Sequence, residues 1–130
     1  MSSWVLDASA LIACVHHEPG EEVVTGALLA GAVMSSVNLS EVVARLSDAG
    51  MPAEDIHEAL NSFELTIDPF DGEGAFAAGL LRPSTRRAGL SLGDRACLAL
   101  AMRTGLPALT GDRAWRDVGS DLGVEVSIFR

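Results

Sequence analysis

The sequence predicts an α/β fold in which helices cover both faces of a central, mostly parallel sheet of about five short strands. The first observation is that short apolar runs, long enough for a strand, alternate with longer amphipathic segments along the whole chain. The second is that 48% of the 130 residues are hydrophobic, which is enough for a sizeable core and fits a single domain over residues 1–130. No internal repeat, linker or low-complexity segment interrupts the alternation.

In the first half of the chain, cap and turn residues indicate where elements begin and end. Pro19, Glu21 and Glu22 predict a helix start, because proline and acidic side chains are favoured in a first helical turn, and Gly31 predicts the end of that helix. Asn38 is expected to be the N-cap of the next helix. The expected elements are strands over residues 4–6, 32–35 and 64–68, the last at a sheet edge, and helices over residues 8–17, 19–31, 38–50 and 52–63.

The second half continues this alternation around one strongly apolar helix. Ser91 is expected to cap the helix and Gly105 to end it. Because residues 92–103 are apolar over much of the helix circumference, we place this helix at the centre of the fold. Residues 82–89 are expected to form a polar, basic connector. The other expected elements are helices over residues 71–81 and 111–117 and strands over residues 106–110 and 124–129.

The charge pattern excludes several classes of function. The net charge is −9 and all nine basic residues are arginines, so any nucleic acid must be contacted locally rather than by a broad basic surface. Receiver-type phosphoryl-transfer domains and P-loop nucleotide-binding proteins both need a lysine beside the phosphate, and the sequence contains no lysine.

Composition also predicts where the protein is found. The apolar runs are shorter than the roughly 18 residues that a membrane span requires, and no basic residue precedes the first strand, so we expect neither a membrane span nor a signal peptide. Cys14 and Cys97 lie in helix-like segments and are expected to be buried free thiols of a cytoplasmic protein.

Four acidic residues are expected to meet at one edge of the sheet. Asp7 directly follows the first strand, and Glu41 lies in the first turn of the helix after the second strand. Asp94 lies in the first turn of the central helix, and Asp112 follows the strand into which that helix leads. Because ligands of open α/β sheets bind at the carboxyl ends of the strands, these four acids are candidate site residues.

Each acid also has a simpler explanation as a helix cap. Asn38-x-x-Glu41 and Ser91-x-x-Asp94 match the capping-box pattern, and the last acid can complement a helix dipole. A non-catalytic interaction module whose acids are only caps is therefore an alternative. Asp7 is the hardest to explain in this way, because it follows a buried strand. Carboxylates about 4 Å apart would repel by roughly 4 kcal/mol at an effective dielectric constant near 20, unless a cation or shared protons offset the charge.

The chemistry of these candidate ligands indicates a reaction class. Ligands that offer only oxygen atoms favour a hard cation, Mg²⁺ or Mn²⁺, over zinc. Such an ion lowers the pKa of a water molecule, orients it, and neutralises charge that develops during attack on phosphorus. We therefore expect metal-assisted phosphodiester hydrolysis, which requires neither histidine nor lysine.

Four motifs resemble those of the PIN-domain ribonucleases and, more narrowly, of the VapC-type toxins of bacterial type II toxin–antitoxin modules. They are Val5-Leu6-Asp7-Ala8-Ser9-Ala10-Leu11, Ser40-Glu41, Leu92-Gly93-Asp94 and Leu109-Thr110-Gly111-Asp112-Arg113-Ala114-Trp115. The resemblance covers essentially the whole chain, and it implies a PIN-like three-layer α/β/α fold and a Mg²⁺- or Mn²⁺-dependent endoribonuclease. The catalytic, metal-binding quartet that it implies is Asp7, Glu41, Asp94 and Asp112.

The resemblance also implies supporting residues and partners. Thr110 matches a hydroxyl residue that hydrogen-bonds within the site, and Ser9 matches a small polar residue beside the first aspartate. The spacing of Asp117 leaves open whether it is an additional acid of the site. The implied substrate is RNA, and the implied partners are a second copy of the chain and a cognate antitoxin that can place a basic side chain in the acidic site. A housekeeping PIN nuclease without an antitoxin is the alternative within this family.

The arginines are the natural contacts for RNA phosphates. Arg95 and Arg113 each directly follow a proposed metal ligand and are the best-placed candidates. Further candidates are Arg82, Arg86, Arg87 and Arg116. The alternative is that most of these side chains are solvated and form at best weak surface ion pairs.

Overall fold

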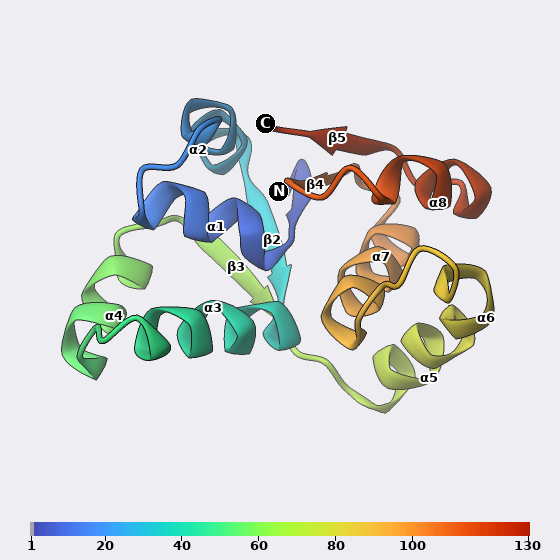
Figure 1. Ribbon diagram of the computed structural model, residues 1–130, viewed down its shortest axis with the longest axis horizontal. Coiled ribbons are helices and arrows are strands. Elements are labelled where there is room, and N and C mark those ends of the chain that lie inside the picture. Colours follow the sequence, from blue (N-terminus) through green and yellow to red (C-terminus); the bar gives the residue numbers. More distant parts are fainter. Residues whose placement is uncertain (1) are drawn as a thin grey trace.

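In the computed structural model, which describes residues 2–130, five strands form one sheet. They are β1 (Trp4–Leu6), β2 (Ala32–Ser35), β3 (Leu65–Asp68), β4 (Ala108–Thr110) and β5 (Val126–Ile128). Their spatial order is β3-β2-β1-β4-β5, and every neighbouring pair is parallel (Figure 1). The predicted sheet is confirmed, with β3 at an edge, and its strands are all parallel rather than mostly so.

Helices cover both faces of this sheet, as predicted (Figure 1). One side carries α1 (Ala8–Val15), α2 (Glu21–Ala30), α3 (Ser36–Asp48) and α4 (Ala53–Asn61), and the other carries α5 (Gly72–Leu80), α6 (Arg82–Thr85), α7 (Leu92–Thr104) and α8 (Trp115–Leu122). Alternate strand residues enter two separate cores: Leu6 and Met34 pack with the first group of helices, and Val5 and Val33 pack with the second. Because successive strand side chains point to opposite faces, this alternation produces a three-layer α/β/α arrangement.

The register of the sheet places Asp7 at the centre of its carboxyl edge. Val5 is level with Val33 of β2, and Leu6 is level with Leu109 of β4. The backbone N–H of Asp7 then donates to the Leu109 carbonyl oxygen over 3.3 Å. Asp7 therefore leaves the sheet between the ends of its two central neighbours, which is the position that the sequence predicted.

The start of α3 differs from the prediction. Its N-cap is Ser35, whose hydroxyl accepts the N–H of Val37 over 3.3 Å, because β2 runs into the helix without a loop. The prediction of Asn38 as the N-cap is wrong, since Asn38 lies inside the helix and is only 1% exposed. Glu41 is consequently not the acid of a capping box at this helix start.

Four segments of the second half also differ from the prediction. The connector over residues 82–89 contains the short helix α6, in which the buried Thr85 hydroxyl donates to the Leu81 carbonyl oxygen over 2.8 Å. The helix predicted over residues 111–117 begins only at Trp115 and continues to Leu122, because the preceding residues form a hydrogen-bonded turn. The last two strands, β4 and β5, are shorter than predicted.

Other local predictions are confirmed. Ser91 and Gly105 are the caps of α7, and that helix packs against both α3 and α5 at the centre of the molecule. Both thiols are free, as predicted, and Cys97 is buried, whereas Cys14 is only partly buried rather than buried as predicted. None of the helices in residues 2–130 combines the length and the apolar character needed to cross a membrane.

Candidate functional site

Asp7 is a buried carboxylate at the carboxyl end of β1, with only 5% of its surface exposed. Its Oδ1 accepts the Ser9 hydroxyl over 2.7 Å and the Ala10 N–H over 3.1 Å, and its Oδ2 accepts the Thr110 hydroxyl over 2.6 Å. The bond from Ala10 makes Asp7 the N-cap of α1, so the expectation that it resists explanation as a cap is corrected. A cap needs one such bond, however, whereas here two hydroxyl groups also fix both carboxylate oxygens.

Burial raises the pKa of Asp7 from 3.8 to about 6. Hydrogen bonds from Thr110, Ser9 and Ala10 oppose this rise, and the negative charge of Asp94 adds to it. In its ionised form Asp7 therefore lacks compensating positive charge. Buried carboxylates with raised pKa values are concentrated at functional sites, because catalysis and metal binding use the charge that folding alone does not favour.

Asp94 lies in the first turn of α7 and belongs to a complete capping box. The Ser91 N–H donates to Asp94 Oδ2 over 2.9 Å, and the Asp94 N–H donates to the Ser91 hydroxyl oxygen over 3.2 Å. The capping explanation is therefore correct for this acid. It does not exclude a second role, because the charge of Asp94 also reaches Asp7.

Glu41 is held against the first turn of α7. The buried Asn38 amide donates to Glu41 Oε1 over 2.8 Å and to the Gly93 carbonyl oxygen over 2.9 Å. A Cβ atom on Gly93 would overlap all three atoms of the Glu41 carboxyl group, so a side chain at this position would displace that carboxylate. The Oδ1 atom of Asn38 is buried without a hydrogen-bond partner. Sequence reasoning treated Asn38 as a cap and missed this bridge.

The Cys97 thiol reports how three of the predicted acids are arranged. Burial raises the pKa of this thiol well above 9.0, and the charges of Asp7, Asp94 and Glu41 raise it further. Carboxylates from the start of α1, from α3 and from α7 therefore all lie within electrostatic range of one buried thiol.

The fourth acid, Asp112, lies on the exposed turn after β4. Its N–H donates to the Thr110 hydroxyl oxygen over 3.0 Å, and its Oδ1 accepts the Ala114 N–H over 2.9 Å. The neighbouring Gly111 N–H donates to the Ser9 hydroxyl oxygen over 3.0 Å. The hydroxyls of Thr110 and Ser9 therefore connect this turn to Asp7, and Asp112 lies at the rim rather than in the buried part of the site.

The four acids do not form a closed ligand cage. Within residues 2–130, no three histidine, cysteine or acidic side chains are close enough to hold a metal ion together. The expected quartet is therefore only partly assembled. The residues nevertheless fit a hard cation, because the donors are oxygen atoms, Asp7 lacks compensating charge, and Asn38 offers an unpaired carbonyl oxygen. Mg²⁺ in particular needs only one or two protein carboxylates and keeps several water molecules.

The two arginines predicted as RNA contacts have backbone partners in the structure. The Arg95 side chain is directed to α5, where its Nη1 donates to the Ala78 carbonyl oxygen over 3.1 Å. Its Nε is buried without a hydrogen-bond partner. Arg113 donates weakly to the Arg130 carbonyl oxygen over 3.4 Å. Asp117 is exposed in the first turn of α8. Arg130 follows β5 to the same sheet edge as the acids, a position that the sequence analysis did not consider.

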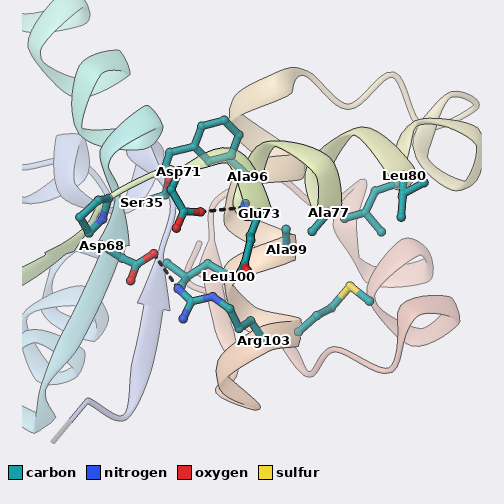
Figure 2. A pocket seen from close by; sticks show the side chains of 15 residues that line it. Ser35, Asp68, Asp71, Glu73, Ala77, Leu80, Ala96, Ala99, Leu100 and Arg103 are labelled. Carbon is teal, nitrogen blue, oxygen red and sulfur yellow. Dashed lines mark hydrogen bonds and ion pairs between the residues drawn. The ribbon is translucent and has the colours of Figure 1, made fainter.

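A groove of about 640 Å³ is lined mainly by residues of α5 and α7 (Figure 2). Its lining includes Leu81, Ala96 and Leu100, and two further lining residues, Asp68 and Arg103, form an ion pair of 2.6 Å that Figure 2 shows. None of the four predicted ligands lines it. The acids of the candidate site therefore lie outside the lining of this groove, although Ser35 and Asp68, the last residues of β2 and β3, contribute to it.

Comparison with known proteins agrees with the fold. The model of the PIN domain family matches residues 4–120. Three solved structures are similar. The DNA-bound VapBC complex of Salmonella typhimurium has a TM-score of 0.79 at 18% identity, with 100% of both chains covered. DNA-bound VapBC2 of Rickettsia felis has a TM-score of 0.75 at 16% identity and VapBC-5 of Mycobacterium tuberculosis has a TM-score of 0.59 at 22% identity, each with 98% of both chains covered. No curated protein sequence matches the chain. Since the family model spans nearly the entire length, the chain belongs to the PIN domain family.

Proposed function

We propose that the chain is a Mg²⁺- or Mn²⁺-dependent endoribonuclease that hydrolyses RNA phosphodiester bonds, and that residues 1–130 form a single PIN domain. The observation that most supports this proposal is the setting of Asp7, a buried carboxylate of raised pKa at the carboxyl edge of the sheet. Glu41 and Asp94 lie near enough for all three charges to act on Cys97. Membership of the PIN domain family also supports nuclease chemistry.

In this proposal the metal ligands are Asp7, Glu41, Asp94 and Asp112. When bound, the ion supplies a water molecule activated for attack on phosphorus and neutralises charge on the phosphate. Asp7 contributes a rigid carboxylate, because Ser9 and Thr110 hold its two oxygens in place. Asn38 orients Glu41, as groups behind a metal ligand commonly do.

We further propose that this nuclease is a cytoplasmic toxin neutralised by a cognate antitoxin, and that it forms a homodimer. The support comes from the three structures compared above, each of which is described as a VapBC assembly. The free thiols Cys14 and Cys97 suit a reducing compartment. Co-expression with the protein encoded in the neighbouring reading frame, followed by light scattering of the purified product, tests both the partner and the dimer.

A cleavage assay tests the catalytic proposal. RNA oligonucleotides and tRNA should be cut in Mg²⁺ or Mn²⁺ and remain intact in EDTA, and Asp94→Asn should abolish cutting. Asp48→Asn is the matched control, because Asp48 is an exposed acid at the far end of α3. Equal cleavage by the folded Asp94→Asn variant, or by the parent in EDTA, would show that the site assignment is wrong.

A non-catalytic interaction module is the second candidate function, and one observation favours it. Asp7 and Asp94 do cap helices, so their presence can be explained without a metal. Thermal unfolding in rising Mn²⁺ separates the candidates, because a ligand that binds only the folded state raises its stability. A metal site predicts a rising midpoint that Asp94→Asn removes, whereas isolated caps predict no change.

A further inference from the structure

Arg130 lies at the carboxyl edge of the sheet, where the predicted metal ligands also lie. Thr110 of β4 is level with Ile128 of β5, and the Phe129 N–H then donates to the Thr110 carbonyl oxygen over 3.2 Å. Because the two strands are parallel, whatever follows β5 lies beside the turn that follows β4. Arg130 therefore lies beside Gly111, and Gly111 belongs to the same turn as the proposed ligand Asp112.

The guanidinium group of Arg130 is held in place rather than free in solvent. A Cβ atom built on Gly111 would lie 2.7 Å from Arg130 Nε and 3.0 Å from its Cζ, so the group rests directly on the glycine backbone. Its Nη1 donates to Glu18 Oε1 over 3.1 Å, and its Cζ lies 5.2 Å from the centre of the Phe129 ring. The side chain remains 39% exposed, which leaves it accessible to a ligand.

Arg130 is also connected to the most buried acid of the site. The glycine on which it rests donates its N–H to the Ser9 hydroxyl oxygen, and Ser9 donates to Asp7. A guanidinium group has five N–H donors, and the ion pair with Glu18 uses one of them. A fixed, partly exposed cation with spare donors thus lies beside the turn that carries Asp112, in a chain of net charge −9.

We propose that Arg130 binds a phosphate group of the RNA strand at the site, which rests on the proposed function. A guanidinium group matches the geometry of phosphate oxygens and donates two parallel hydrogen bonds to them. RNA approaching this acidic chain needs a local positive contact, because the net charge opposes association. Arg130 supplies that contact next to the proposed metal ligands and takes no part in the chemical step.

RNA binding and cleavage measured together test this contact. Arg130→Gln should raise KM about tenfold, as expected when a charged hydrogen bond is lost, while kcat and Mn²⁺ affinity stay close to those of the parent. With the inactive Asp94→Asn chain, fluorescence anisotropy should show a salt dependence of log Kd that is shallower by about 0.7 after Arg130→Gln, the value for one phosphate contact on a single strand. Arg130→Lys, which keeps the charge, should keep the parent's salt dependence and lose part of the affinity.

Two matched variants separate a phosphate contact from a structural role. Arg103→Gln removes another exposed arginine that has one carboxylate partner, and Glu18→Gln removes the partner of Arg130 while keeping the cation. Both should stay within about twofold of the parent in RNA affinity, since such exposed ion pairs contribute little. The contact is disproved if Glu18→Gln weakens RNA binding as much as Arg130→Gln, or if folded Arg130→Gln binds RNA like the parent. Failure of the parent itself to bind and cut RNA would instead overturn the proposed function.

Discussion

Replacing Asp7 with asparagine should stabilise the metal-free protein and at the same time abolish RNA cleavage. The pKa of this carboxyl is 3.8 in the unfolded chain and about 6 in the folded protein, where burial disfavours its charge. Each pKa unit corresponds to about 1.4 kcal/mol, so ionised Asp7 lowers the free energy of unfolding by about 3 kcal/mol at neutral pH. Asparagine keeps an acceptor for Ser9 and Ala10 but leaves the Thr110 hydroxyl without one, at a cost of about 1 kcal/mol. The expected net gain is about 2 kcal/mol.

The stability difference between Asp7→Asn and the parent should depend on pH. Because the folded pKa lies above the unfolded value, the folded protein holds the proton more tightly, and stability falls as the pH rises from about 4 to about 6. Asparagine does not titrate, so the variant should exceed the parent in stability above this window and lose its advantage below it.

The difference in free energy of unfolding between Asp7→Asn and the parent can be measured by urea unfolding in EDTA, at about pH 4 and about pH 7.5. Asp48→Asn is the control. Burial would be the wrong explanation if Asp7→Asn were less stable than the parent at the higher pH, or if the difference between the two proteins did not change with pH.

Two further predictions concern groups behind the proposed ligands. Gly93→Ala should displace the Glu41 carboxylate and weaken Mn²⁺ binding by about tenfold or more, as measured by electron paramagnetic resonance. Gly79→Ala is the control and should leave Mn²⁺ affinity unchanged, because a Cβ atom there meets nothing within 4 Å. Equal Mn²⁺ affinities in the two variants would contradict the contact between Gly93 and Glu41. Thr110→Val removes a hydrogen bond that lowers the pKa of Asp7. The acidic limb of the plot of cleavage rate against pH should therefore move up by about one pH unit. An unchanged acidic limb would show that this hydrogen bond does not lower the pKa of the carboxyl group.

Much of the fold was predictable because its signals are local. The strands Trp4–Leu6 and Ala32–Ser35 coincide with the short apolar runs, and Ser91 and Gly105 bound α7 through ordinary cap preferences. The start of α3 was mispredicted because Asn38 is a good N-cap residue by type, whereas the direct passage from β2 into the helix gives that role to Ser35.

Other features depend on contacts between distant parts of the chain, and no local pattern reports them. The turn before Trp115 is held by a bond from Gly111 to Ser9, which lies 102 residues away in sequence. The bridge from Asn38 to Gly93 likewise depends on how closely α3 approaches α7. Sequence patterns can indicate that such residues share an edge of the sheet, but not how far apart their side chains lie.

The candidate acids show a further limit of sequence reasoning. Capping and site membership were treated as competing explanations, but Asp7 caps α1 while it also carries two hydroxyl bonds and a raised pKa. One carboxylate has more lone pairs than a single cap uses, so both roles fit one side chain. Arg130 has no local signal of its own, because its place beside Gly111 depends on the pairing of β5 with β4.

The thiol of Cys97 has a consequence for selectivity among metals. Burial, the larger cause, and the charges of Asp7, Asp94 and Glu41 raise the pKa of this thiol well above 9.0, so it is neutral at physiological pH in the metal-free protein. Zinc and copper(I) gain much of their affinity from soft thiolate ligands, whereas Mg²⁺ and Mn²⁺ gain nothing from them. In the metal-free protein this buried sulfur therefore stays a neutral thiol, and the charged ligands at the sheet edge are carboxylate oxygens, which suit hard ions.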